Sequence, residues 1–104
     1  MSDVADITLE QIIARLREIA PAIKAEGVTR LAIFGSRARG DARPDSDLDV
    51  LIETNPCATF GWKNLTTVSL MCQDATGLSV QVAMRDSLKP RVAERMADDL
   101  TEVF

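Results

Sequence analysis

The sequence predicts an α/β (α+β) fold, in which a small mixed β-sheet has flanking helices in the order α-β-α-β-α-β-α. Three observations predict it. Apolar residues recur at helical intervals before Gly27, two short apolar runs follow with a polar loop between them, and a later run alternates apolar and polar residues. The length of 104 residues, 46% of them hydrophobic, suits one compact core, so we expect a single domain over residues 1–104.

The first element is predicted to be a helix from about Thr8 to Ala25. Thr8 and Gln11 have the spacing of a capping box, in which each side chain bonds the backbone N–H of the other residue. Apolar residues then follow at helical intervals, namely Ile12, Leu16, Ile19 and Ile23.

Two strands and a short helix are predicted next. Val28 to Phe34 reads as a strand, Gly35-Ser36 as the turn into a short helix over residues 36–40, and residues 41–46 as a loop. Asp47 to Glu53 reads as the second strand, because apolar and polar positions alternate at its start.

The last third of the chain is predicted to contain a helix, a strand and a helix. Phe60 to Asp74 carries apolar residues at mixed helical spacing, and Leu78 to Met84 alternates with period two. Ser87 and Pro90 mark the entry to the final helix, whose apolar residues are Val92, Met96, Leu100 and Val103.

Composition narrows the classes of function. A net charge of −4 argues against broad attraction to a nucleic-acid backbone, and no apolar stretch reaches the roughly 20 residues needed to span a bilayer. The first six residues lack the basic start and apolar centre of a signal peptide, so we expect a cytoplasmic protein that contacts no membrane.

Absent residue types exclude further chemistry. Without histidine, the Ser-His and Cys-His nucleophile systems are excluded, whereas phosphoryl or nucleotidyl transfer needs only carboxylates, a divalent ion and phosphate donors. Without tyrosine, the chain cannot modify itself on one. Cys57 and Cys72 lack metal-ligand spacing and are expected to be inert, reduced thiols.

The turn at Gly35-Ser36 is the first candidate site. Glycine permits a sharp turn and the close approach of a ligand, and the serine hydroxyl is a phosphate donor beside the start of a helix. Such dipeptides also occur in ordinary turns, and the nearby Arg37, Arg39 and Arg43 are either phosphate ligands or solvated surface residues.

Asp47 and Asp49 are the second candidate site. Residues two apart on a strand share a face with Cα atoms about 6.5 Å apart, so both carboxylates can share a cation. A solvated strand end is the alternative for an isolated Asp-x-Asp. Here apolar residues follow Asp49 at once, which places the pair at the edge of a buried strand.

At these residues the chain resembles the minimal nucleotidyltransferases, small members of the DNA polymerase β-like superfamily. Gly35-Ser36, ten intervening residues and Asp47-Leu48-Asp49 match the family signature G-S-x10-D-x-D. Arg37-Ala38-Arg39-Gly40, Ser46, Val80-Gln81-Val82 and Leu88-x-Pro90 also agree, so that the resemblance extends over roughly residues 31–91.

The resemblance implies a fold and a set of roles. It implies the polymerase β-like fold, with Gly35 and Ser36 holding the phosphates of ATP and Asp47 and Asp49 as catalytic ligands of Mg²⁺. Arg37 and Arg39 would lie near phosphate or partner. The family's third carboxylate falls on Gln81, a neutral and much weaker Mg²⁺ ligand.

The resemblance also implies a partner and leaves two functions open. Minimal nucleotidyltransferases of this length resemble antitoxins that transfer AMP from ATP to a tyrosine of a HEPN-type toxin. The alternative is a catalytically impaired antitoxin that neutralises its partner by binding only, with Phe60, Trp62 and Phe104 as candidate contact residues. Transfer to a small molecule such as an antibiotic is a third interpretation.

Overall fold

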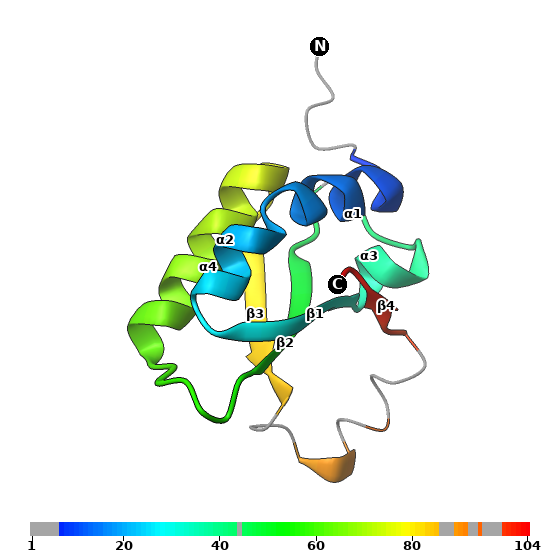
Figure 1. The fold of residues 1–104 in the computed structure, drawn as a ribbon. Coiled ribbons are helices and arrows are strands. Elements are labelled where there is room, and N and C mark those ends of the chain that lie inside the picture. The colour runs from blue at the N-terminus through cyan, green and yellow to red at the C-terminus, as the bar shows by residue number, and fades with distance from the viewer. Residues whose placement is uncertain (1–6, 44, 86–88, 92–93, 95–98) are drawn as a thin grey trace.

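The computed structural model describes residues 7–43, 45–85, 89–91, 94 and 99–104. Its elements follow one another as helices α1 and α2, strand β1, helix α3, strand β2, helix α4 and strands β3 and β4 (Figure 1). Their bounds are α1 Leu9–Glu18, α2 Ala20–Ala25, β1 Val28–Phe34, α3 Ser36–Arg39, β2 Leu48–Thr54, α4 Trp62–Thr76, β3 Val80–Met84 and β4 Thr101–Glu102.

The four strands form one mixed sheet in the order β3-β2-β1-β4. β1 is antiparallel to both β2 and β4, whereas β2 and β3 are parallel. Since β1 runs opposite to its neighbours β2 and β4, the end of β1 and the start of β2 meet at the same edge of the sheet. The predicted small mixed sheet with flanking helices is therefore confirmed.

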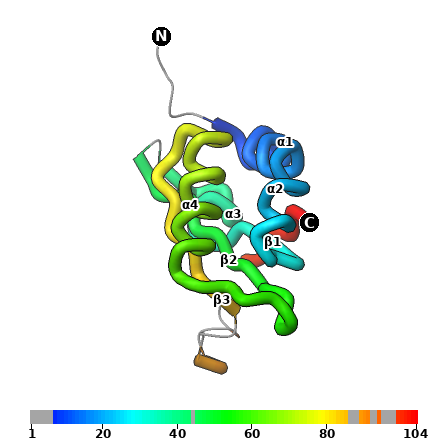
Figure 2. The backbone as a smooth tube through the Cα atoms, turned by 60° about the vertical axis from the view of Figure 1, so that its left-hand side comes forward, coloured from blue at the N-terminus to red at the C-terminus, as the bar shows by residue number. Residues whose placement is uncertain are grey.

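A helical layer covers one face of this sheet (Figures 1 and 2). Alternate residues of β1 and β2 point into that layer and are fully buried, and the helices contribute the rest of the same core. The buried core residues include Ile12, Leu16, Ile23, Leu31, Ile33, Leu48, Val50, Ile52, Val68 and Cys72.

The opposite face of the sheet carries the residues that alternate with the buried core residues along each strand. β1 places Arg30, Ala32 and Phe34 on it, and the register pairs these with Glu53, Leu51 and Asp49 of β2. On β3, Gln81 and Ala83 lie on the same face beside Asp49 and Leu51, and Arg85 follows directly after the strand. On β4, Glu102 lies beside Ala32. We call this surface, defined by these residues, the polar sheet face.

The first predicted helix is two helices. The capping box is present, with the Gln11 N–H donating to Thr8 Oγ1 at 3.1 Å and the Thr8 N–H donating to Gln11 Oε1 at 3.0 Å. α1 nevertheless ends at Glu18, because Pro21 has no N–H to donate to the carbonyl four residues earlier and its ring crowds that carbonyl. Pro21 instead lies in the first turn of α2, where a proline is tolerated.

The prediction of a final helix through Val103 is wrong. Thr101 and Glu102 form β4, and the Val103 N–H donates to the Leu31 carbonyl at 2.8 Å. Pairing with β1 satisfies backbone groups at the edge of the sheet, and it buries Val103 in the core. Pro90, Arg91 and Glu94 are helical, whereas Ser87, Val92 and Met96 lie outside the described residues.

None of the helices in the described ranges is long and apolar enough to cross a membrane.

Candidate functional site

Gly35 forms the turn that joins β1 to α3. Its backbone has φ +78° and ψ −156°, a region that is nearly exclusive to glycine. The Gly35 carbonyl accepts the N–H groups of Ala38 and Arg39, at 3.1 and 3.0 Å, and so begins the short helix at Ser36. A Cβ at position 35 would overlap Asp49 Oδ2, which shows that the turn lies directly against this carboxylate.

Asp47 and Asp49 lie at the start of β2, on the same edge as the turn. Asp49 is half-buried and pairs with Phe34 of β1, while Asp47 is exposed just before the strand. Across the parallel pair, Asp49 lies opposite Gln81 of β3. The Gln81 side-chain amide donates a long hydrogen bond of 3.4 Å to Asp47 Oδ2. The fold therefore brings Gly35, both aspartates and Gln81 together.

The electrostatics of the aspartate pair suit a bound cation. Burial raises the pKa of the Asp49 carboxyl, the charge of Asp47 raises it further, and Arg39 opposes both effects. An ionised Asp49 is therefore held at a free-energy cost that a positive ion would relieve. Carboxylate oxygens are the ligands Mg²⁺ prefers, so the donor types fit this metal.

The described residues contain no group of three or more acidic, histidine or cysteine side chains that could hold a metal ion. Gln81 lies opposite Asp49 and donates to Asp47, and its correspondence to the family's third carboxylate stays a prediction. Glu53, two positions beyond Leu51 on β2, is engaged with Arg85 at 3.9 Å, and Asp86 lies outside the described residues. Among the described residues, Asp47, Asp49 and Gln81 thus bring two carboxylates and one amide together at this edge.

Arg37 is a buried arginine that holds the loop before Asp47. Only 7% of it is exposed, and its Nη2 donates to the Arg43 carbonyl at 3.2 Å and to the Ser46 carbonyl at 3.0 Å. The Ser46 hydroxyl also accepts the Arg43 N–H at 2.8 Å. Arg37 therefore links α3 to the loop that leads into the aspartates, and its contact with a phosphate stays a prediction.

Arg39 lies on the exposed side of α3 and pairs with two carboxylates. Its Nε is 3.3 Å from Asp41 Oδ2, and its Nη1 is 3.2 Å from Asp99 Oδ2. Asp99 was missed in the sequence, because nothing local to it indicates that the C-terminal segment returns to α3. The charge of Arg39 lowers the pKa of the Asp49 carboxyl, and the role of Arg39 in nucleotide binding stays a prediction.

The aromatic residues and cysteines differ in exposure. Phe60 and Phe104 are partly buried and pack against the core. Lys24 Nζ also lies 5.2 Å from the centre of the Phe104 ring. Trp62, 73% exposed at the start of α4, is the aromatic residue available for a partner. Cys57 and Cys72 are free thiols, and burial raises the pKa of Cys72 to about 11, which keeps that thiol protonated.

Comparison with known families shows the family to which the chain belongs. The model of the family described as "Nucleotidyltransferase domain" matches residues 9–98, which include the turn, both aspartates and Gln81. The chain belongs to the nucleotidyltransferase domain family. The resemblance drawn from the Gly-Ser turn and the Asp-x-Asp pair is thereby confirmed.

Known nucleotidyltransferases resemble this chain over most of its length. A protein adenylyltransferase, MntA of Thermococcus cleftensis, is 28% identical over 101 residues, which are 96% of this chain and 100% of the relative. A solved structure assigned as a minimal nucleotidyltransferase has a TM-score of 0.79 at 28% identity, covering 92% of this chain and 96% of the other.

A more distant structure shares the fold alone. It is the complex of a tri-AMPylated HEPN toxin with an MNT antitoxin from Shewanella oneidensis, with a TM-score of 0.62 at 11% identity. The match covers 88% of this chain and 70% of the chain in that complex.

Proposed function

We propose that this chain transfers AMP from ATP to a protein hydroxyl, a tyrosine of a HEPN-type toxin, and so acts as an antitoxin. The observation that carries the proposal is the contact between the Gly35 turn and the Asp49 carboxylate, because it joins the turn predicted to hold phosphate to the carboxylates predicted to hold a metal. The name of the adenylyltransferase relative supports AMP as the transferred group, and the toxin–antitoxin complex supports the class of partner.

Each residue of the site has one role in this proposal. Gly35 and Ser36 would receive the phosphates of ATP, and Asp47 and Asp49 would hold Mg²⁺. When bound, Mg²⁺ neutralises charge on the phosphate oxygens and so lowers their repulsion of an incoming oxygen. Arg37 fixes the loop that positions Asp47, through its bonds to the Arg43 and Ser46 carbonyls.

The transfer forms one bond and breaks one. The acceptor hydroxyl oxygen bonds to the α-phosphorus, while the bond from that phosphorus to the oxygen that bridges to the β-phosphorus breaks. Pyrophosphate leaves with the electron pair, and the hydroxyl proton passes to water. The absence of tyrosine from this chain means that a tyrosine acceptor must come from another molecule.

Neutralisation by binding alone is the second candidate function. Gln81 favours it, because the amide lies where a third acid would complete a metal site and instead donates to Asp47. The exposed Trp62 supplies an aromatic anchor that such a binding surface needs.

Intact-mass spectrometry separates the two functions. The protein is mixed with Mg²⁺, ATP and a HEPN-type toxin, and the mass of each chain is followed. We expect adenylate to be added to the partner, and we expect Asp47→Ala to abolish the addition. Asp45→Ala is the matched control, since it removes an exposed carboxylate from the same loop without touching the site.

The outcome that contradicts transfer is equally definite. If no adenylate is added by the unaltered protein while the toxicity of the partner is still inhibited, and Asp47→Ala inhibits equally, the chain neutralises its partner by binding alone.

A further inference from the structure

The polar sheet face contains a cavity next to the candidate site. Its volume is about 270 Å³, and its apolar lining includes Leu100 and the paired sheet residues Ala32 and Leu51, which we call the floor. Ala32 and Leu51 are paired across β1 and β2 and lie one row further along the sheet than the pair Phe34 and Asp49. Because residues two apart on a strand are separated by about 6.5 Å, the floor begins within one side-chain length of Asp49.

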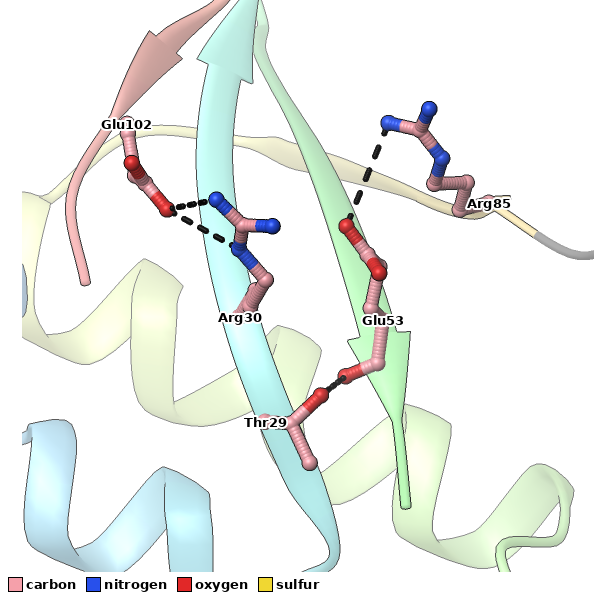
Figure 3. A network of polar contacts seen from close by, with 5 residues as sticks. All are labelled: Thr29, Arg30, Glu53, Arg85 and Glu102. Atoms are coloured by element: carbon pink, nitrogen blue, oxygen red, sulfur yellow. Dashed lines mark hydrogen bonds and ion pairs between the residues drawn. The ribbon is translucent and has the colours of Figure 1, made fainter. Parts of the chain in front are cut away.

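The charged residues that line the cavity, which we call its walls, belong to two ion pairs. Figure 3 shows these ion pairs. Arg30 Nη2 lies 2.7 Å from Glu102 Oε2, and Arg85 Nη1 lies 3.9 Å from Glu53 Oε2. The charges alternate in sign across the strands, from Arg85 to Glu53, Arg30 and Glu102. The walls therefore carry no net charge, which favours a neutral occupant over a phosphate.

The geometry of phosphoryl transfer places ATP and the acceptor on opposite sides of Asp49. The Gly35 turn lies at the sheet edge on one side of the Asp49 row, and the cavity lies on the other. In phosphoryl transfer the entering and leaving oxygens lie roughly in line on opposite sides of the phosphorus. If the leaving phosphates occupy the turn, the acceptor oxygen arrives from the cavity side.

We infer that this cavity is the subsite for the acceptor residue, and that it receives a neutral aromatic ring bearing a hydroxyl, a tyrosine side chain of the partner. The inference rests on the proposed function. Ala32, Leu51 and Leu100 contact the ring, and the half-exposed guanidiniums of Arg30 and Arg85 are placed to stack on it. The volume lies below the roughly 300–1,000 Å³ of pockets for whole small molecules, so a single side chain fits better than a nucleoside.

Binding of N-acetyl-L-tyrosinamide tests the subsite without requiring transfer. Amide correlation NMR spectra are recorded with Mg²⁺ and α,β-methylene-ATP, whose methylene bridge replaces the oxygen that would leave. The ligand is expected to shift the amides of Ala32, Leu51 and Leu100. Ala32→Phe fills the floor and is expected to weaken binding at least about tenfold. Ala22→Phe adds the same ring to the exposed side of α2 and is the matched control, expected to bind as the unaltered protein does.

A second variant keeps the test decisive if Ala32→Phe does not fold. Arg85 is half-exposed, so Arg85→Ala preserves the core while removing one stacking group, and it is expected to weaken binding several-fold. Shifts confined to other residues, or equal binding by Ala32→Phe and the unaltered protein, overturn the inference. Shifts at the same three amides with adenosine in place of the tyrosine compound also overturn it, because the cavity would then hold the nucleoside.

Failure of the subsite and failure of the proposed function give different results. Loss of the function appears as no adenylate on the partner with the unaltered protein. Loss of the subsite alone appears as normal transfer by Ala32→Phe, with an unchanged KM for the partner.

Discussion

Gly35→Ala tests the contact on which the site depends. Alanine at φ +78° and ψ −156° would carry backbone strain of about 1–3 kcal/mol. Its Cβ would also displace the Asp49 carboxylate, and an off-rotamer side chain costs about 0.5–1.5 kcal/mol. We therefore expect the free energy of unfolding to fall by about 3 kcal/mol, which lowers Tm by about 15 °C in a chain of this size.

Gly77→Ala is the matched control for this substitution. Gly77 also has a positive φ, of +74°, but a Cβ there would meet nothing within 4 Å. Only the backbone strain remains, and it costs about 1–2 kcal/mol. Gly77 has ψ +12°, in the left-handed helical region, whereas Gly35 lies in a region nearly exclusive to glycine. The difference between the two variants in urea unfolding therefore reports the contact with Asp49 together with the greater backbone strain at position 35.

A double-mutant cycle isolates that contact. Asp49→Ala removes the oxygen that the new Cβ would meet, so Gly35→Ala should cost about 1 kcal/mol less in the Asp49→Ala background. Additivity of the two substitutions to within about 0.5 kcal/mol would refute the proposed contact between the turn and the carboxylate.

Three further predictions follow from the same geometry. Gln81→Asp completes a third acid beside the pair, so it should tighten Mg²⁺ binding about tenfold in calorimetry; unchanged affinity would show that position 81 is too far from the metal. Because the Asp49 pKa is raised, the folded state gains from its protonation below about pH 3.8, and this gain is lost as pH rises through the folded-state pKa. Asp49→Asn should therefore raise Tm at neutral pH and match the unaltered protein in acid, whereas a lower Tm at neutral pH would contradict this reasoning. Arg37→Met removes the bonds to the Arg43 and Ser46 carbonyls and should cost about 2 kcal/mol in urea unfolding with faster amide exchange in that loop; unchanged exchange would mean that the loop holds itself.

The strands and the turn could be predicted from the sequence, because apolar alternation, helix caps and glycine turns involve residues that are neighbours in the chain. β1 has the predicted bounds Val28–Phe34, and the Thr8 cap begins the first helix as expected. The convergence of Gly35, Asp49 and Gln81 was also predictable, since each lies at the end or start of a strand and one edge of the sheet collects them. The roles of these residues in chemistry stay predictions.

The remaining features depend on contacts between distant parts of the chain. The spacing of Leu100 and Val103 fits a helix as well as it fits β4, and only the open edge of β1 decides between them. Arg37 reads as a surface residue on a short helix, but the Arg43 and Ser46 carbonyls fold back over it and bury it. Pro21 is the exception, because its effect on the first helix is local and could have been predicted.

The pairing of β1 with β4 also sets an order of events during synthesis. Arg30 and Glu102, which meet across these strands, are 72 positions apart in the chain. On the ribosome β1 emerges early, and its free edge stays open to other strands until residues 101–104 have been made. Contacts between residues so far apart in sequence form slowly. During this period the unpaired edge of β1 is exposed to aggregation, and a chaperone that covers it would prevent this.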